Sequence, residues 1–266
     1  MELDQLIAQA LERLRAAAPL IHCITNYVTA GDTANMLLAA GASPIMADDP
    51  SESAEITALA AGLTLNLGTP SQNRIEAMMR SGAMANQRDI PAVFDPVGAS
   101  CSGLRRNAVS ELTRRVKLAA VRGNISELSY LAGFSAQERG VDAAEAVISP
   151  LKAAEAAAKR LSCVCAVTGE QDVISDGSRT IVLKNGTPLL RNITGAGCMT
   201  SALCAAFISV SDPFTGTAAG IAFMDICGET AAENSHGMGG FRMALFDAAG
   251  NITPETLTER LVIDER

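Results

Sequence analysis

The pattern of hydrophobic and polar positions divides the chain into short apolar runs that alternate with segments of helical spacing. The apolar runs lie at residues 43–47, 63–69, 91–96, 118–124 and 164–169. Helical patterns lie at 3–14, 49–62, 71–84, 149–160 and 254–262, and in the second of these Asp49, Pro50 and Glu52 suit the N-cap, N1 and N3 positions. Because strands that alternate with helices build parallel sheets, the pattern predicts an α/β fold with a mainly parallel central sheet.

The pattern changes after residue 169. Asp176–Gly177 and Asn185–Gly186 are hairpin turn signals between β-rich arms, so they predict a short antiparallel section. The alanine-rich stretch 195–235 predicts packed helices. No linker, low-complexity tract or internal repeat interrupts the chain, which predicts a single domain over residues 1–266.

Composition narrows the functional class. The chain has 266 residues, of which 48% are hydrophobic, a net charge of −8 and scattered Lys and Arg, which argues against a nucleic-acid surface. No apolar run is long enough to span a bilayer, and the N-terminal segment reads as an acidic amphipathic helix instead of a secretion signal. Seven cysteines without a CxxC pair, of which Cys163 and Cys165 read as buried strand residues, suit a reducing compartment. We therefore expect a cytoplasmic protein that contacts neither membrane nor nucleic acid.

Polar residues gather at the carboxyl ends of the predicted strands. They include Met46–Ala47–Asp48, Gly68–Thr69, Asp95, Arg122–Gly123–Asn124 and Thr168–Gly169–Glu170. In open α/β sheets, ligands bind outside the carboxyl ends of the strands. The sequence thus predicts the functional site at this edge.

The stretch "NITGAGCMTSAL" at 192–203 carries glycines at the start of a predicted helix. The backbone N–H groups of Ala196, Gly197 and Cys198 would point at an anion, as phosphoryl transfer requires. A tight strand-to-helix turn with no ligand explains the same pattern. The chain has no GxxxxGK[ST] motif, and the loop lacks the third glycine of a dinucleotide fingerprint, so neither a P-loop nor a Rossmann site fits.

Cys198 in this loop and three side chains at the predicted strand ends have both a chemical and a structural interpretation. Cys198 at a helix N-terminus is expected to have a lowered thiol pKa and to act as a base or nucleophile. The structural alternative is a small residue packed beneath the loop. Asp95 and Glu127 could hold Mg²⁺ through waters, but Asp95 also suits a turn, and Glu127 forms a capping box with Asn124. Arg122, the only arginine at this edge, could clamp a phosphate or form a surface ion pair. The chain has only two histidines, and nothing local pairs either one with Cys198 for acyl transfer.

Several blocks of the chain resemble the hydroxyethylthiazole kinase family, in the family's order and over nearly the whole length. These are "PLIHCITNYVTAGDTANMLLAAGASPIMADDP", "FDPVGAS", "VRGNISELSYLAG", "AVTGEQDVISDG", "NITGAGCMTSALCAAF" and "GMGGFRMALFDA". The resemblance implies a ribokinase-like three-layer sandwich with helices on both faces. It also implies transfer of the γ-phosphate of ATP, with Mg²⁺, to the primary alcohol of 4-methyl-5-(2-hydroxyethyl)thiazole in thiamin salvage. Gly31 and residues 237–240 depart from the family pattern in local loop detail.

Roles carried over from the family fall on matching positions of this chain. Met46, Gly195 and Asn26 would lie at the thiazole, Arg122 and Thr168 at ATP, and Asp95 and Glu127 around the magnesium. The resemblance also implies a homotrimer with active sites between subunits. Cys198 stands where related sugar kinases carry aspartate, so we expect a weak base or a spacer, with the loop N–H groups providing most of the catalysis.

Three other functions remain open at this level. One is a related small-alcohol kinase for hydroxymethylpyrimidine or pyridoxal. Another is a nucleotide-binding protein without turnover. The last is a cysteine-dependent acyl transferase, in which a thiol reagent would label Cys198 and which would need no Mg²⁺.

Overall fold

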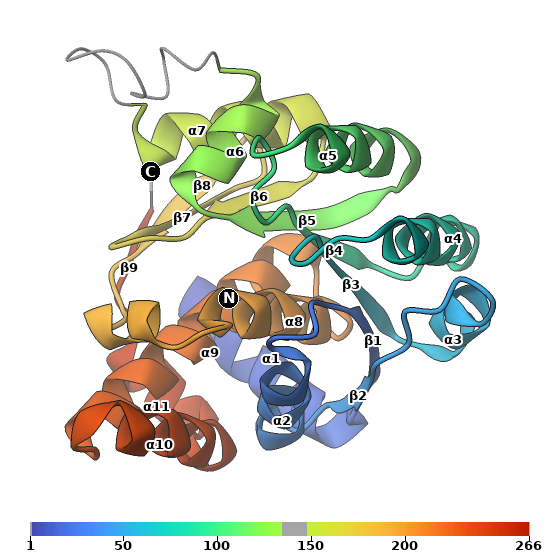
Figure 1. Ribbon diagram of the computed structural model, residues 1–266. Helices are drawn as coiled ribbons and strands as arrows, with labels where there is room; N and C mark the ends of the chain where they lie inside the picture. Colours follow the sequence, from blue (N-terminus) through green and yellow to red (C-terminus); the bar gives the residue numbers. More distant parts are fainter. Residues whose placement is uncertain (1, 135–147, 266) are drawn as a thin grey trace.

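One nine-stranded sheet runs through the molecule (Figure 1). The computed structural model describes residues 2–134 and 148–265, and in them the strand order is β2-β1-β3-β4-β5-β6-β7-β8-β9. The strands are β1 (Leu20–Ile24), β2 (Ser43–Ile45), β3 (Gly62–Asn66), β4 (Ala92–Asp95), β5 (Leu118–Gly123), β6 (Val164–Val167), β7 (Asp172–Ser175), β8 (Thr180–Leu183) and β9 (Ile263–Glu265). Strands β1 to β6 pair in parallel, and β7, β8 and β9 join antiparallel. The predicted α/β class with a mainly parallel sheet is confirmed.

Helices cover both faces of the sheet (Figure 1). One face carries α4 (Gln72–Arg88), α5 (Gly103–Arg115), α6 (Ile125–Ala132) and α7 (Pro150–Leu161). The other carries α1 (Leu3–Ala17), α2 (Ala30–Ala40), α8 (Ala196–Ile208), α9 (Pro213–Glu233), α10 (Gly237–Asn251) and α11 (Pro254–Arg260). The short α3 (Ser53–Leu59) packs beside α4, and a 3₁₀ helix, η1 (Pro188–Asn192), precedes α8. No helix in these described ranges combines the length and apolarity that a membrane crossing needs.

The side-chain alternation of the central strands builds two cores. Val93, Ala120 and Ala166 point to the core that α8 and α9 cover, whereas Phe94 and Val121 point to the core on the α4–α7 side. Buried parallel strands therefore appear as continuous apolar runs, which is why the sequence pattern located β3, β4, β5 and β6. Of the two cysteines predicted as buried strand residues, Cys165 is buried in β6 as expected, whereas Cys163 precedes the strand and is only partly buried against the α4–α7 core.

Two local predictions about the first half of the chain need correction. The strand β1 has no counterpart among the predicted runs, although four of its five residues are buried. The helix that was expected to start at Asp49 begins at Ser53, with Glu52 as its N-cap residue. The Asp49 carboxylate instead accepts hydrogen bonds from the backbone N–H (2.8 Å) and hydroxyl (2.6 Å) of Ser51, which forms a turn and delays the helix.

Of the two predicted hairpins, only the first exists. Asp176–Gly177 connects β7 to β8, and Gly177 has φ +92°, in the left-handed region. The second, at Asn185–Gly186, was wrong, because β8 ends at Leu183 and the chain enters η1. Asn185 donates to the Arg260 carbonyl (2.9 Å), and its Oδ1 accepts from the backbone of the segment leading into β9. That segment supplies the partner strand for β8.

Candidate active site

The carboxyl ends of β4, β5 and β6 and the start of α8 surround a cavity of about 570 Å³. Its polar lining consists of Asp95, Arg122, Asn124, Glu127, Thr168, Asp172, Arg191, Cys198, Thr200 and Asp225. The chain passes from β1 to β2 on one side and then to β3 on the other, so the strand order switches direction between β1 and β3. Open α/β sheets bind ligands at such a switch point, which Cys198 borders.

The glycine loop forms the N-terminus of α8. Gly195 is the N-cap residue, with φ +89°, and the helix starts at Ala196. The Ala196 N–H already donates to the carbonyl of Ile193 at 3.3 Å, so its predicted place in an anion cradle must be corrected. The first turn of a helix leaves its N–H groups without intrahelical acceptors. The cradle therefore rests on the N–H groups of Gly197 and Cys198, with the positive end of the helix behind them.

Arg122 reaches the cradle from β5. Its guanidinium Nη2 donates to the hydroxyl of Thr168, its Nη1 lies 4.0 Å from Oδ2 of Asp95, and only 15% of the side chain is exposed. A Cβ on Gly197 would overlap Nη1, so the guanidinium lies directly against the loop. Nε is buried and has no partner among the described residues. A largely buried guanidinium with a free Nε donor beside a helix N-terminus is equipped for an anion and is no ordinary surface ion pair.

Asp95 lies at the bottom of the cavity and is 2% exposed. Its Oδ2 accepts hydrogen bonds from Nδ2 of Asn66 (2.7 Å) and from the hydroxyl of Ser201 (2.8 Å). The pKa of this carboxyl is raised to about 6, mainly by burial. The positive charge of Arg122 lowers this pKa, and the negative charge of Glu127 raises it. The two carboxylates therefore interact electrostatically, although each is held by its own hydrogen bonds.

Glu127 performs the predicted capping role. Its Oε2 accepts from the backbone N–H of Asn124 (2.8 Å), and the Asn124 side chain accepts from the N–H of Glu127 (3.0 Å), so the capping box of α6 is complete. Its Oε1 accepts from the N–H of Gly98 (2.9 Å) in the loop after β4. Glu127 thus ties two loops of the cavity together while its carboxylate lines that cavity.

The expected lowering of the Cys198 thiol pKa was wrong. Burial raises this pKa, and the charge of Asp95 raises it further. These two effects outweigh the helix N-terminus, which favours the thiolate. The Sγ atom accepts hydrogen bonds from Nδ2 of Asn26 (3.1 Å) and Nδ2 of Asn66 (3.3 Å). Cys198 is therefore a neutral thiol held by two side-chain amides.

The structure brings eight of the ten predicted site residues into this one cavity. They are Asp95, Arg122, Glu127, Thr168, Gly195, Ala196, Gly197 and Cys198. Asn26 is 95% buried and reaches the site through its bond to Cys198. Met46 follows β2, is 38% exposed and does not line this cavity.

Sequence reasoning missed several polar residues of the site. Arg191 also lines the cavity, so Arg122 is not the only arginine there. Asp172 and Asp225 lie side by side in its wall, and burial raises the pKa of both carboxyls; a hydrogen bond between them raises that of Asp225 further. Asn66 ends a strand and was detectable by the strand-end rule that selected Asp95. Ser201 had no such signal, because it lies inside a helix.

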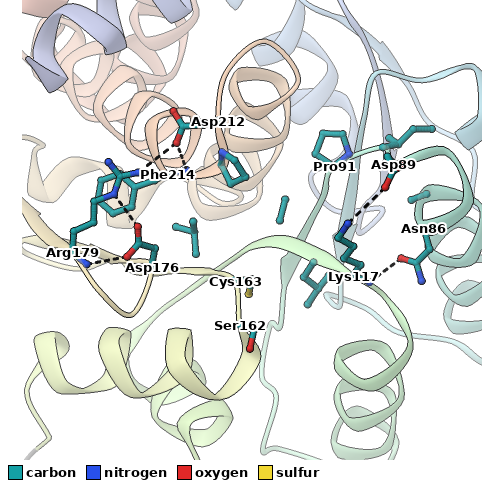
Figure 2. Close-up of a pocket in the computed structure, with 16 residues that line it drawn as sticks. Asn86, Asp89, Pro91, Lys117, Ser162, Cys163, Asp176, Arg179, Asp212 and Phe214 are labelled. Atoms are coloured by element: carbon teal, nitrogen blue, oxygen red, sulfur yellow. Dashed lines mark hydrogen bonds and ion pairs between the residues drawn. The ribbon is translucent and has the colours of Figure 1, made fainter. Parts of the chain in front are cut away.

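A second cavity, of about 460 Å³, lies at the opposite end of the sheet (Figure 2). Its charged groups already have partners, since Lys117 pairs with Asp89 at 3.6 Å and Arg179 with Asp176 at 2.8 Å. The Arg179 guanidinium also lies 3.9 Å from the ring centre of Phe214. None of the predicted site residues lines this cavity, and the reactive groups gather at the carboxyl ends of the strands.

Comparisons with known proteins point to one family. The hydroxyethylthiazole kinase family model matches residues 11–255. A hydroxyethylthiazole kinase of Ruminiclostridium cellulolyticum is 45% identical, with 99% of each chain covered. The solved structure of the Pyrococcus horikoshii hydroxyethylthiazole kinase superimposes with a TM-score of 0.89 at 35% identity, covering 98% of each chain. Staphylococcus aureus pyridoxal kinase in complex with ADP shares the fold alone, with a TM-score of 0.63 at 14% identity, 93% of this chain and 98% of that chain. The chain therefore belongs to the hydroxyethylthiazole kinase family.

Proposed function

We propose that residues 1–266 form a single kinase domain that transfers the γ-phosphate of ATP to the primary alcohol of 4-methyl-5-(2-hydroxyethyl)thiazole. Family membership supports the reaction class and the acceptor. One structural observation carries the proposal furthest. The largely buried Arg122, with a free Nε donor, lies against the glycine loop, so one small space offers both a guanidinium and helix N–H groups to a phosphate.

The nucleotide would occupy the cavity with its phosphates at this loop. Arg122 and Thr168 would bind ATP, and the N–H groups of Gly197 and Cys198 would bind the phosphoryl group in transit. Phosphoryl transfer passes through a loose transition state, so positioning and charge neutralisation provide most of the catalysis. The Arg122–Thr168 hydrogen bond holds the guanidinium in place for this task.

Magnesium fits the carboxylates of Asp95 and Glu127. Both line the cavity, and the two charges interact. No cluster of three or more His, Cys, Asp and Glu suited to a metal occurs in residues 2–134 and 148–265. In proteins Mg²⁺ keeps several waters and takes one or two carboxylates plus substrate phosphates, so two carboxylates are enough to hold it. When bound, the ion would neutralise charge on the phosphates.

Cys198 would act mainly as a spacer beside the acceptor alcohol. Its thiol is neutral, and two amides already donate to its sulfur, so it is poorly prepared to remove a proton. Asn26, Gly195 and Met46 would contact the thiazole. Gly195 is the N-cap residue of α8 and Asn26 donates to Cys198 in its first turn, whereas Met46 stands apart from the cavity of a single chain.

A homotrimer with active sites between subunits would bring a partner to that side of the molecule. Tyr27 (74% exposed), Val28 (56%) and Leu38 (58%) are large apolar side chains that a single chain leaves open near Met46 in the sequence. Met243 on α10, which packs against α2, is 62% exposed. Contiguous patches of exposed apolar residues mark interaction surfaces, and these side chains are candidates for such a surface. We place the enzyme in the cytoplasm, a reducing compartment that suits its seven free cysteines.

The test is ADP release from purified protein with MgATP. Hydroxyethylthiazole is compared with hydroxymethylpyrimidine, pyridoxal and no acceptor. Thiazole-dependent release, lost in Arg122→Met, supports the proposal. Release with one of the other alcohols instead replaces the acceptor, and release with none of them refutes the kinase function.

A further inference from the structure

Asn66 is fully buried, ends β3 and uses its whole hydrogen-bonding capacity inside the site. Its Nδ2 donates to Oδ2 of Asp95 (2.7 Å) and to Sγ of Cys198 (3.3 Å). Its Oδ1 accepts from the N–H of Gly68 (2.9 Å) and from Nδ2 of Asn26 (3.2 Å). A side-chain amide has two donors and two acceptor sites, and here all four have partners.

The orientation of this amide follows from its partners. The backbone N–H of Gly68 can only donate, so the atom that faces it is Oδ1. Nδ2 must then face Asp95 and Cys198. A Cβ on Gly68 would lie 2.9 Å from Oδ1 of Asn66 and from Nδ2 of Asn26, so only glycine lets the backbone come this close.

Sheet register places Asn66 between the two functional sides of the site. Asn66 pairs directly with Asp95 across β3 and β4, and β3 borders the switch point next to β1. Asn26, its third side-chain partner, follows β1 and belongs to the expected thiazole side. A single amide therefore connects the carboxylate proposed for magnesium, the thiol at the glycine loop and the acceptor side.

We propose that Asn66 is a positioning residue, which orients the Asp95 carboxylate and the Cys198 sulfur relative to each other and holds Asn26 in place. The proposal rests on the proposed kinase function for its kinetic consequences. Asn66 itself touches no reacting atom. It acts through the direction of its two N–H donors, which an isosteric acceptor cannot reproduce.

Asn66→Asp tests this directly, because it keeps the shape and both acceptor contacts but loses both donors. The new carboxylate would face Asp95 and the sulfur, and displaced catalytic groups cost about 100-fold in rate. We expect kcat to fall by about that factor, with KM for ATP changed by less than about threefold, because ground-state binding of the nucleotide does not use Asn66. If Asn66→Asp does not fold, Asn66→Ser provides the same comparison and should lose about tenfold in kcat.

Asn185→Asp is the matched control. Asn185 is also a buried asparagine whose Nδ2 donates to a carboxylate, that of Glu229 at 3.1 Å, but it does not line the cavity at the carboxyl ends of the strands. Asn185→Asp should lose about as much stability as Asn66→Asp but keep the kcat of the parent protein. An equal loss of kcat in both variants would reduce Asn66 to a structural residue and overturn the proposal.

Thiol labelling supplies a readout that does not depend on turnover. Asn66→Asp removes a donor to Cys198 and adds charge beside it, so alkylation of Cys198 should slow about tenfold relative to the exposed Cys101 of the same molecule. If the parent protein shows no kinase activity, the kinase function fails while labelling still tests Asn66. A folded variant whose kcat and Cys198 labelling both stay within about twofold of the parent overturns the proposal.

Discussion

Gly195→Ala should strain the molecule at the start of the glycine loop. Gly195 has φ +89° and ψ 2°, in the left-handed region that L side chains rarely adopt. An added Cβ would overlap Cγ2 of Thr29 and lie 2.7 Å from its Cβ. Thr29 is 3% exposed and precedes α2 as its N-cap residue, so it has little room to withdraw.

The cost of this change has two parts. The left-handed backbone costs an alanine about 1–2 kcal/mol. Overpacking of a tight buried contact costs about 1–3 kcal/mol. We therefore expect the free energy of unfolding to fall by about 2–5 kcal/mol. Relief of the overlap would move the start of α8 away from α2, and kcat should fall because the Gly197 and Cys198 N–H groups move with it.

Urea unfolding of Gly195→Ala measures this loss. Gly250→Ala in α10 is the control, since no atom lies within 4 Å of its added Cβ and its φ is outside the left-handed region; it should change stability by less than about 1 kcal/mol. Thr29→Ser removes Cγ2 and should restore about 1–2 kcal/mol in the Gly195→Ala background. A Gly195→Ala protein within about 0.5 kcal/mol of the parent, or no recovery with Thr29→Ser, would refute this reasoning.

Three further changes separate chemistry from structure. Cys198→Ala should keep kcat within about tenfold because the thiol is neutral, whereas a loss above about a hundredfold in steady-state assays would identify a general base. Glu127→Gln loses an acceptor for the N–H of Asn124 or Gly98, so it should lower the unfolding free energy by about 1 kcal/mol. It should also raise the Mg²⁺ concentration needed for half-maximal rate, and an unchanged Mg²⁺ titration would contradict the metal role. Burial lowers the pKa of His22, so the unfolded chain binds the proton more readily. The unfolding free energy should therefore fall as pH drops below about 6.5, and less so in His22→Asn; equal pH slopes in urea titrations would contradict this.

Much of the candidate site could be predicted from local patterns. Asp95, Arg122 and Thr168 were selected because polar residues end buried strands, and all three line one cavity. The loop N–H donors followed from glycines at a helix start. What those patterns could not provide was the partners of each group, since Asn66 meets Asp95 only through the register of β3 and β4.

The amphipathic helices and the capping box of Asn124 and Glu127 follow from the sequence itself, because they depend on contacts within a few residues. The strands β3 to β6 were visible as continuous apolar runs, but their pairing joins segments far apart in the chain. The prediction of a hairpin at Asn185–Gly186 failed because β9, which is distant in the sequence, pairs with the edge of β8. The predicted lowering of the Cys198 thiol pKa also failed. The helix N-terminus is a local feature, whereas burial and the Asp95 charge, which raise this pKa, come from elsewhere in the chain. Charge, burial and hydrogen-bond partners at a site sum over all neighbouring segments, so only the assembled tertiary structure decides them.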